Sequence, residues 1–237
     1  MKKLILILAL TLVSFAYLSA DVYIKQETKI DPATAMGQKV KNTVSELWFG
    51  KNKMATKTGE MNMIMNMDAK KAYIISPKTK TYVESGLPMD MTKLMPEAMA
   101  PMLKTMLNGM TVAIKPNGQT KKVGNWDTKG YDVNMKMMGM DMKMVYWVAS
   151  NVGFDWKAYS TLYSEMYKVQ FQGNEKFVEE FKKLDGYPVA IETTMMGMKT
   201  STLVTEINPN KAPTPDVYAV PAGYRKTERV EMGMGSK

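Results

Sequence analysis

Apolar and polar side chains alternate along most of the chain, and this alternation predicts short β-strands. In segment 22–29, Val22 and Ile24 alternate with Tyr23 and Lys25, so the two sets point to opposite faces of one strand. The alternating segments are separated by hairpin-length turns, a pattern typical of an antiparallel meander that curves into an open sheet or barrel. We expect strands at 22–29, 41–49, 53–58, 60–67, 71–76, 81–84, 110–115, 120–123, 126–138, 141–149, 189–196 and 199–207.

Two segments break this alternation and have the three- and four-residue spacing of amphipathic helices. The first is 88–108, where Pro96 and Pro101 divide the helix into short pieces and each proline lies near a helix start. The second is 155–183, with a break at Gly173. No linker or repeat divides the chain, so we expect one domain.

The N-terminal segment 1–20 has the pattern of a secretory signal peptide. Lys2 and Lys3 precede an apolar run that is too short to span a bilayer, and the run ends in small residues up to Ala20. Cleavage after Ala16 and retention as a membrane anchor are the alternatives. The absence of cysteine excludes a lipidated N-terminus, so we expect a free periplasmic protein. The expected organisation is a signal peptide at 1–20, a single domain at 21–225 and a flexible polar tail at 226–237.

The composition excludes several kinds of chemistry. The chain contains no histidine and no cysteine, so it cannot form a Ser-His-Asp triad, a cysteine nucleophile or a conventional zinc site. The acidic residues show no motif that singles out a catalytic pair. We therefore expect neither an enzymatic activity nor a cofactor.

The positive charge of the chain indicates little about a specific partner. The formal net charge of +9 falls to +7 when Lys2 and Lys3 leave with the signal. The lysines are scattered, and Arg225 and Arg229 are the only arginines, whereas nucleic-acid binders rely on arginine for bidentate contacts. We expect no nucleic-acid partner. A monomer is expected, in transient contact with an anionic membrane surface or an envelope partner protein.

Methionine is unusually frequent, with 26 residues. In segment 88–108 the methionines take the apolar helical positions, as ordinary packing requires. On the predicted strands they alternate, so each run forms a single stripe of thioethers. These stripes are Met61, Met63, Met65 and Met67; Met135 and Met137; and Met140, Met142 and Met144.

Three interpretations of the stripes remain open. The thioethers are ordinary core, or they line a cavity for an apolar ligand, or they bind Cu(I) or Ag(I). Methionine suits a cavity because its three rotatable bonds and polarisable sulfur let it repack around variable acyl chains. It also suits a soft metal ion. Neighbouring methionines on one strand face lie about 7 Å apart, so a metal site needs ligands from several strands.

The candidate site residues follow from these interpretations. A one-residue change of register would move the whole wall set to the other face. The candidate wall of a ligand cleft is Met61, Met63, Met65, Met135, Met137, Met142, Met144 and Trp147. The candidate lid is Met91, Leu94, Met95, Met99, Met102, Leu103 and Met106. The alternative metal ligands are Met137, Met140 and Met142.

Several short motifs, in the order of the predicted elements, carry a resemblance to a known family. They are LWFGKNKM at 47–54, the segment 60–67 with KAYII at 71–75, GYDV at 130–133, VYWV at 145–148, GYPV at 186–189 with ETTMMGM at 192–198, and VPAGY at 220–224. On these residues the chain resembles the LolA/LolB-like periplasmic lipoprotein-carrier superfamily, which includes the mycobacterial LppX and LprG relatives. It is most similar to an uncharacterised exported family within that superfamily.

The resemblance implies an α+β fold in which a strongly curved antiparallel half-barrel sheet carries helices that plug its concave side. It also implies a cleft for acyl chains, with plug helices that move aside on loading. Carriers of this class are expected to latch the lid with an arginine, and no arginine precedes Arg225 here, so only the fold and the ligand chemistry carry over. We expect a periplasmic binding or carrier protein for a lipid or acyl chain. The alternative is a periplasmic Cu(I)- or Ag(I)-binding protein.

Overall fold

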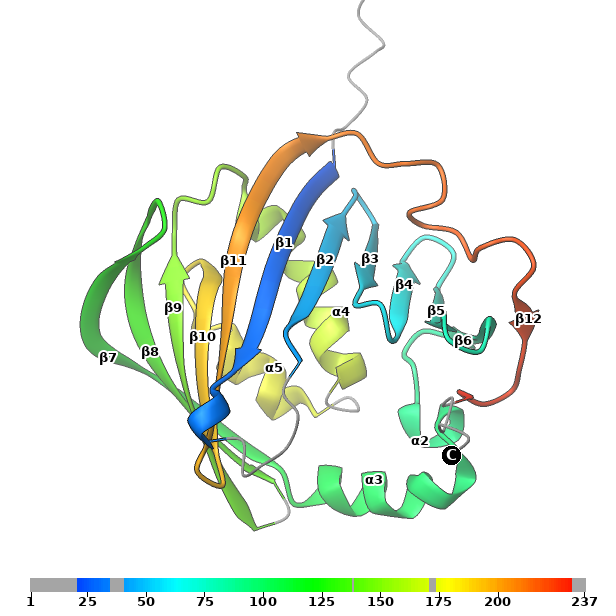
Figure 1. Ribbon diagram of the computed structural model, residues 1–237, viewed down its shortest axis with the longest axis horizontal. Helices are drawn as coiled ribbons and strands as arrows, with labels where there is room; N and C mark the ends of the chain where they lie inside the picture. The colour runs from blue at the N-terminus through cyan, green and yellow to red at the C-terminus, as the bar shows by residue number, and fades with distance from the viewer. Residues whose placement is uncertain (1–20, 35–40, 138, 171–173, 232–237) are drawn as a thin grey trace, which may run out of the picture.

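Twelve strands form one continuous sheet in the computed structural model of the chain (Figure 1). The structure describes residues 21–34, 41–137, 139–170 and 174–231. The strands are β1 (Asp21–Ile30), β2 (Thr43–Phe49), β3 (Lys53–Lys57), β4 (Asn62–Asn66), β5 (Lys71–Ser76), β6 (Thr81–Gly86), β7 (Thr111–Val123), β8 (Trp126–Met137), β9 (Met140–Ala149), β10 (Tyr187–Met195), β11 (Met198–Lys211) and β12 (Arg225–Lys226). Their order across the sheet is β12-β6-β5-β4-β3-β2-β1-β11-β10-β9-β8-β7. All neighbours are antiparallel except β12 and β6.

The sheet is curved and open, because its order ends in β12 at one edge and in β7 at the other. Register shifts occur where β1 pairs with β11, where β10 pairs with β9 and where β7 pairs with β8. Bulges of this kind bend a strand and increase its twist, so they curl the long strands into a half-barrel. The expected α+β half-barrel fold class is confirmed.

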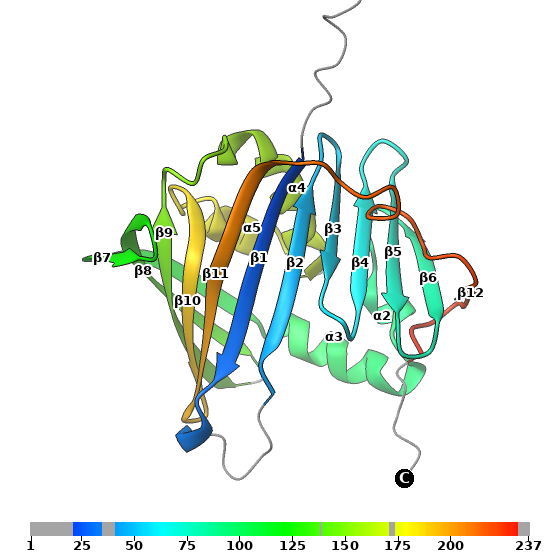
Figure 2. The same ribbon diagram turned by 45° about the horizontal axis from the view of Figure 1, so that its top comes forward.

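The larger helices lie on one face of the sheet, and Figure 1 shows α4 and α5 behind the strands. The helical segments are η1 (Pro32–Thr34), α2 (Met91–Leu94), η2 (Glu97–Met99), α3 (Ala100–Asn108), η3 (Trp156–Tyr159), α4 (Ser160–Gln170) and α5 (Glu175–Phe181). Helix α3 crosses the open side of the half-barrel, from the α2 side toward β7 (Figure 2). We call the face that α4 and α5 cover the inner face, and the opposite one the outer face.

The inner face carries the larger part of the core. Phe49 of β2 stacks on Tyr163 of α4, with 4.9 Å between the ring centroids. Further along the sheet, Phe177 of α5 is 1% exposed and packs in a cluster with residues of β7, β8 and β9. The backbone N–H of Ile114 donates a hydrogen bond of 2.7 Å to the Glu180 carboxylate. These contacts fix α4 and α5 inside the curve of the sheet.

The outer face of β1 to β5 carries a second apolar surface, covered by the segment between β11 and β12. Tyr23 and Trp48 are buried there together with Val217 from this segment. Tyr218 donates a hydrogen bond of 2.6 Å to the carboxylate of Asp21. This part of the sheet is therefore buried on both faces, which accounts for its strands having few exposed positions.

One predicted strand boundary is wrong. Segments 110–115 and 120–123 were expected as separate strands, but β7 is continuous through Pro116. Its register against β8 shifts between Pro116 and Thr120. Proline is tolerated here because β7 is an edge strand, where a missing N–H removes no bond on the open side. The turn signal at Pro116 therefore marks a bulge.

The helical segments agree with the expected breaks where the structure describes them. Helix α2 ends before Pro96, and Pro101 lies in the first turn of α3, where proline loses no helical hydrogen bond. The predicted helical region 155–183 contains η3, α4 and α5. Gly173, the predicted break, lies outside the described residues.

The chain after β12 contacts α2. Val230 is buried, and its N–H donates a hydrogen bond of 2.7 Å to the carbonyl oxygen of Leu94. The packed segment therefore extends past residue 225, the expected end of the domain. Residues 232–237 of the expected tail and residues 1–20 of the expected signal peptide lie outside the described residues.

Candidate functional site

A cleft of about 580 Å³ lies between the inner face of the sheet and helices α2, α3 and α4. Its lining is mostly apolar or aromatic, and its volume is in the usual range for a small-molecule site. The lining residues are Gln26, Leu47, Thr56, Met61, Met63, Ile74, Met91, Met95, Leu103, Tyr146, Tyr163, Met166, Tyr167, Tyr187, Pro188 and Ile191.

The floor of the cleft is one row of paired residues on four adjacent strands. Leu47 of β2 pairs with Thr56 of β3, which pairs with Met63 of β4. Met63 in turn pairs with Ile74 of β5. Directly paired residues share a face, so these side chains form one surface toward the helices. Met61 is two residues from Met63 and points to the same side.

The segment 91–108, which contains α2, η2 and α3, forms the opposite wall, and we call it the cover. It contributes Met91, Met95 and Leu103 to the lining. The cover is tied to the C-terminal segment, because the guanidinium of Arg229 donates a hydrogen bond of 3.0 Å to the carbonyl oxygen of Met95. The Val230 hydrogen bond described above adds a second link.

A cluster of four tyrosines forms the third wall: Tyr146 from β9, Tyr163 and Tyr167 from α4, and Tyr187 from the start of β10. The ring centroid of Tyr163 lies 5.9 Å from that of Tyr187 and 6.4 Å from that of Tyr167. The hydroxyl of Tyr163 is buried and makes no well-aligned hydrogen bond among the described residues, although it interacts with the hydroxyl of Tyr187. A buried hydroxyl that is poorly satisfied loses free energy, so this group gains from any ligand that accepts its hydrogen bond in good geometry.

Burial keeps these phenols protonated. It raises the pKa of Tyr146 and that of Tyr187 to about 12, and the pKa of Tyr163 well above the ordinary tyrosine value. The pKa of Tyr167 is also raised, by burial first and by the neighbouring Tyr146 next. The cluster is therefore a set of neutral hydroxyl groups around neutral pH, able to donate hydrogen bonds.

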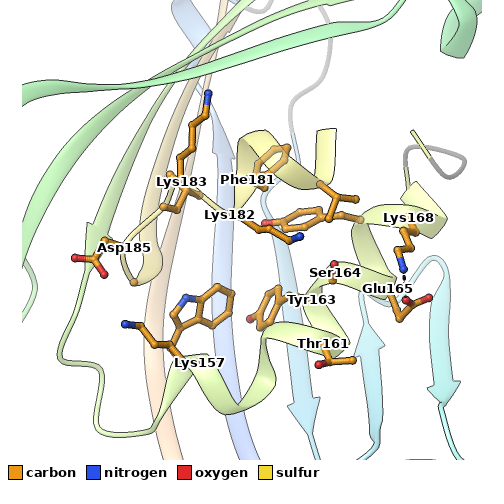
Figure 3. Close-up of a pocket in the computed structure, with 15 residues that line it drawn as sticks. Lys157, Thr161, Tyr163, Ser164, Glu165, Lys168, Phe181, Lys182, Lys183 and Asp185 are labelled. Atoms are coloured by element: carbon orange, nitrogen blue, oxygen red, sulfur yellow. Dashed lines mark hydrogen bonds and ion pairs between the residues drawn. The ribbon is translucent and has the colours of Figure 1, made fainter. Parts of the chain in front are cut away.

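A second pocket of about 530 Å³ lies between α4 and α5, and Figure 3 shows the side chains around it. We call it the helix-pair pocket. Tyr163 and Tyr167 line both this pocket and the cleft. Most of its lysines are ion-paired, since Lys168 pairs with Glu165 at 2.6 Å, Lys182 with Glu179 at 2.6 Å, and Lys183 with Glu180. The charged lining residues are Lys157, Lys168, Lys182, Lys183, Glu165 and Asp185.

The predicted wall residues separate into four groups. Met61 and Met63 line the cleft, and Met65 is fully buried in the adjoining core. Trp147 lies on the outer face, because it is an odd number of residues from the methionines of β9, and its indole N–H donates a hydrogen bond of 3.0 Å to Glu192. The predicted wall residues that lie on β8 and β9 away from the cleft are Met135, Met137, Met142 and Met144.

The predicted lid residues also separate. Those that line the cleft are Met91, Met95 and Leu103. Leu94 is buried in the core and Met99 is partly buried in η2, whereas Met102 is 52% exposed. The side chain of Met106 lies outside the described residues.

Sequence reasoning missed Tyr146, Tyr187 and Ile191, which reach the cleft from β9 and β10. The four-residue spacing of Tyr163 and Tyr167 places both on one helix face and was a partial signal. The strands that this helix face contacts are set by pairing between distant segments of the chain. The spacing of Tyr163 and Tyr167 gives no information about that pairing.

In the described part of the chain, no group of three or more His, Cys, Asp and Glu side chains is placed to hold a metal ion. The methionines of the alternative metal site, Met137, Met140 and Met142, lie at the hairpin end of β8 and β9. No helix among the described residues is long and apolar enough to cross a membrane.

The family model described as "Domain of unknown function (DUF4412)" matches residues 33–224. The chain belongs to this family. A comparison of this DUF4412 protein with curated proteins gives no significant match.

Two solved structures are similar to the DUF4412 chain over most of its length. One is described as an outer membrane lipoprotein-sorting protein domain from Vibrio parahaemolyticus, with 11% identity, 90% of this chain and 95% of that chain covered, and a TM-score of 0.34. The other is a DUF1329 family protein from Desulfovibrio piger, with 10% identity, 89% and 93% covered, and a TM-score of 0.34. A TM-score of 0.34 is too low to support an argument about function. The function is therefore argued from the geometry of the DUF4412 chain alone.

We expect Tyr146 and Tyr187 of this DUF4412 protein to ionise near pH 12, above the ordinary tyrosine pKa of about 10. Between these values the unfolded chain holds fewer protons than the folded chain. The contribution of the two phenols to stability is therefore complete below about pH 10 and is lost as the pH rises toward 12. The absorbance of tyrosinate, followed against pH, measures this directly. The part of the tyrosinate absorbance that appears near pH 12 should decrease in Tyr146→Phe and in Tyr187→Phe. The expectation is wrong if neither variant shows this decrease.

Proposed function

We propose that this protein binds a lipid or a single acyl chain in the cleft beneath the cover, and carries or stores it in the periplasm. The observation that supports this most directly is a cleft of about 580 Å³ whose floor and cover are both mostly apolar. Met63 and Met61 line the floor, and Met91 and Met95 line the cover. Flexible thioethers on both walls can adapt to chains of different length or unsaturation. The signal-like segment 1–20 supports export.

Loading requires the cover to move away from the floor. The cover consists of short pieces, with 4 residues in α2, 3 in η2 and 9 in α3. Helices this short have little stability of their own, so the cover depends on its tertiary contacts. Two of these are the hydrogen bonds from Arg229 to Met95 and from Val230 to Leu94. In this proposal they break when the ligand enters, while the paired strands of the floor stay fixed.

The tyrosine cluster and the helix-pair pocket favour an amphiphilic ligand over a pure hydrocarbon. Tyr163 and Tyr167 line both cavities, so a chain in the cleft has its polar end beside phenol donors and lysines. The hydroxyl of Tyr163, which has only a poorly aligned interaction with Tyr187, can donate to a carbonyl, carboxylate or phosphate oxygen. Lys157, which lines the helix-pair pocket and has no ion pair among the described residues, favours an anionic end.

The proposal assigns a binding role and no catalytic step. A chain without histidine lacks the base that usually activates a serine nucleophile in lipid hydrolysis, and without cysteine it has no thiol nucleophile. Its net charge of +7 after the loss of Lys2 and Lys3 supports transient contact with an anionic membrane surface as the source or destination of the ligand. In this proposal the protein acts as a monomer without a cofactor or nucleic-acid partner.

Blocking the cleft should abolish binding. Met63→Trp and Ile191→Trp each place an indole inside the cleft, so the affinity for a dansyl-labelled fatty acid should fall by about tenfold or more, equivalent to about 1.4 kcal/mol. Fluorescence titration measures the affinity. Leu203→Trp is the matched control, because Leu203 is 42% exposed and adjoins Thr202, the partner of Ile191, so it points to the outer face. Equal affinities in the three folded variants would exclude this cleft as the binding site.

Removing the Tyr163 hydroxyl should separate folding from binding. Tyr163→Phe deletes a buried hydroxyl that has only a poorly aligned interaction with Tyr187, so the free energy of unfolding without ligand should change by less than about 1 kcal/mol. The affinity for the dansyl-labelled fatty acid should fall about 3- to 10-fold, because one hydrogen bond to the ligand is lost. Urea denaturation and fluorescence titration give the two values. A variant that is less stable and binds the probe as tightly as the wild type would contradict this role of Tyr163.

A further inference from the structure

Four methionines outside the cleft form a continuous row across four adjacent strands. Met135 of β8 pairs with Met142 of β9, and Met142 pairs with Met195 of β10. Met195 in turn pairs with Met198 of β11. Directly paired residues point to the same face, so the row presents four thioethers side by side. We call these four residues the methionine row.

The methionine row lies on the inner face but apart from the cleft. Two residues along the strands, Val133, Met144 and Thr193 form the next row, and the row after that contains Tyr146 and Ile191 of the cleft. Each step of two residues is about 7 Å, so about 14 Å separates the methionine row from the nearest cleft row. A ligand in the cleft and an ion on the methionine row therefore do not compete for the same side chains.

The β10–β11 turn fixes one end of the methionine row. Met196 and Gly197 have φ angles of 51° and 83°, and two successive positive φ angles are typical of a two-residue type I′ hairpin loop. This loop holds Met195 opposite Met198. Met196 itself is 67% exposed and is not part of the row. The turn chemistry thus specifies the register on which the row depends.

The spacing of the row suits a metal ion better than a stripe along one strand does. Opposed residues on neighbouring antiparallel strands have Cα atoms about 4.5–5.5 Å apart, against about 7 Å for neighbours on one strand face. With three rotatable bonds, methionine can direct its sulfur toward that of its cross-strand partner while the backbone stays in place. Met137 and Met140 pair one step further toward the hairpin end and add two more thioethers nearby.

The row is partly open to solvent. Met135 is buried, Met142, Met195 and Met198 are partly buried, and a groove of about 420 Å³ is lined by Met135 and Met142. Lys136, Lys143 and Lys199 each follow a row residue directly along the strand and point to the outer face. Asp141 also lines the groove, but it pairs with Lys136 at 3.8 Å, and neutral sulfur ligands are a poor site for hard cations such as Mg²⁺ or Ca²⁺.

We propose that Met135, Met142, Met195 and Met198 form a binding site for a soft monovalent ion, Cu(I) or Ag(I), on the inner face of β8 to β11. Thioethers are among the ligands that select Cu(I) over hard metal ions. The site gives a role to four methionines that do not line the cleft. This proposal does not depend on whether the cleft binds a lipid.

A titration with Ag(I) tests the site, because this ion is soft and keeps one oxidation state. Native mass spectrometry of the full chain should show one tightly bound Ag(I), and the double variant Met142→Leu/Met195→Leu should bind it about tenfold more weakly or not at all. Leucine keeps the volume and apolar character of methionine, so both variants should fold, and circular dichroism verifies this. The matched control is Met61→Leu/Met63→Leu, which removes two thioethers from the cleft and should leave Ag(I) binding unchanged.

The ligand set of Cu(I) gives an independent readout. X-ray absorption of the Cu(I)-loaded chain should show a first shell made of sulfur atoms only. The site is disproved if Ag(I) affinity falls equally in both double variants, which indicates adventitious binding to dispersed methionines, or if it falls in neither. A first shell dominated by oxygen or nitrogen disproves it as well. Loss of dansyl-labelled fatty acid binding in the cleft variants bears on the cleft alone.

Discussion

The structure depends on shielding the concave face of an open, curved sheet from water. Apolar side chains on that face are removed from water only if helices enter the curve, at a gain of about 25 cal/mol for each Å² of apolar surface buried. Helices α4 and α5 do this through Phe49 with Tyr163 and through Phe177. Over the floor formed by Met63 and its partners, α4 forms one side of a space that the cover closes, and this space is the cleft.

Methionine has different surroundings in different parts of this sheet, although the sequence pattern is the same. Met65 is fully buried core, Met63 lines the cleft, and Met142 lies in the cross-strand row. The difference comes from what lies opposite each position of the sheet, since Met63 and Met65 are on the same strand, β4. A flexible, polarisable side chain tolerates all three environments, which is a physical reason for a chain to use it so widely. The three interpretations of the methionine stripes are therefore compatible within one fold.

Alternation predicted the strands well because each strand has to present one apolar face to the helices. It predicted the shared face of Met61, Met63 and Met65, since that depends only on a two-residue period. It failed at Pro116, where an edge strand tolerates a proline and a bulge, and for Trp147, whose odd spacing from the β9 methionines places it on the outer face. The tyrosine wall and the cross-strand methionine row depend on pairing between distant strands, which a local pattern does not contain.

The cleft is proposed to hold a hydrophobic ligand, and the rest of the functional account depends on this ligand. Native mass spectrometry of the protein, released gently from the envelope of its own cell and kept free of detergent, tests this most directly. The account predicts one population heavier than the bare chain by the mass of a single lipid or fatty acid, and this added mass should disappear after extraction with organic solvent. A spectrum that contains only the bare chain before extraction would contradict the account.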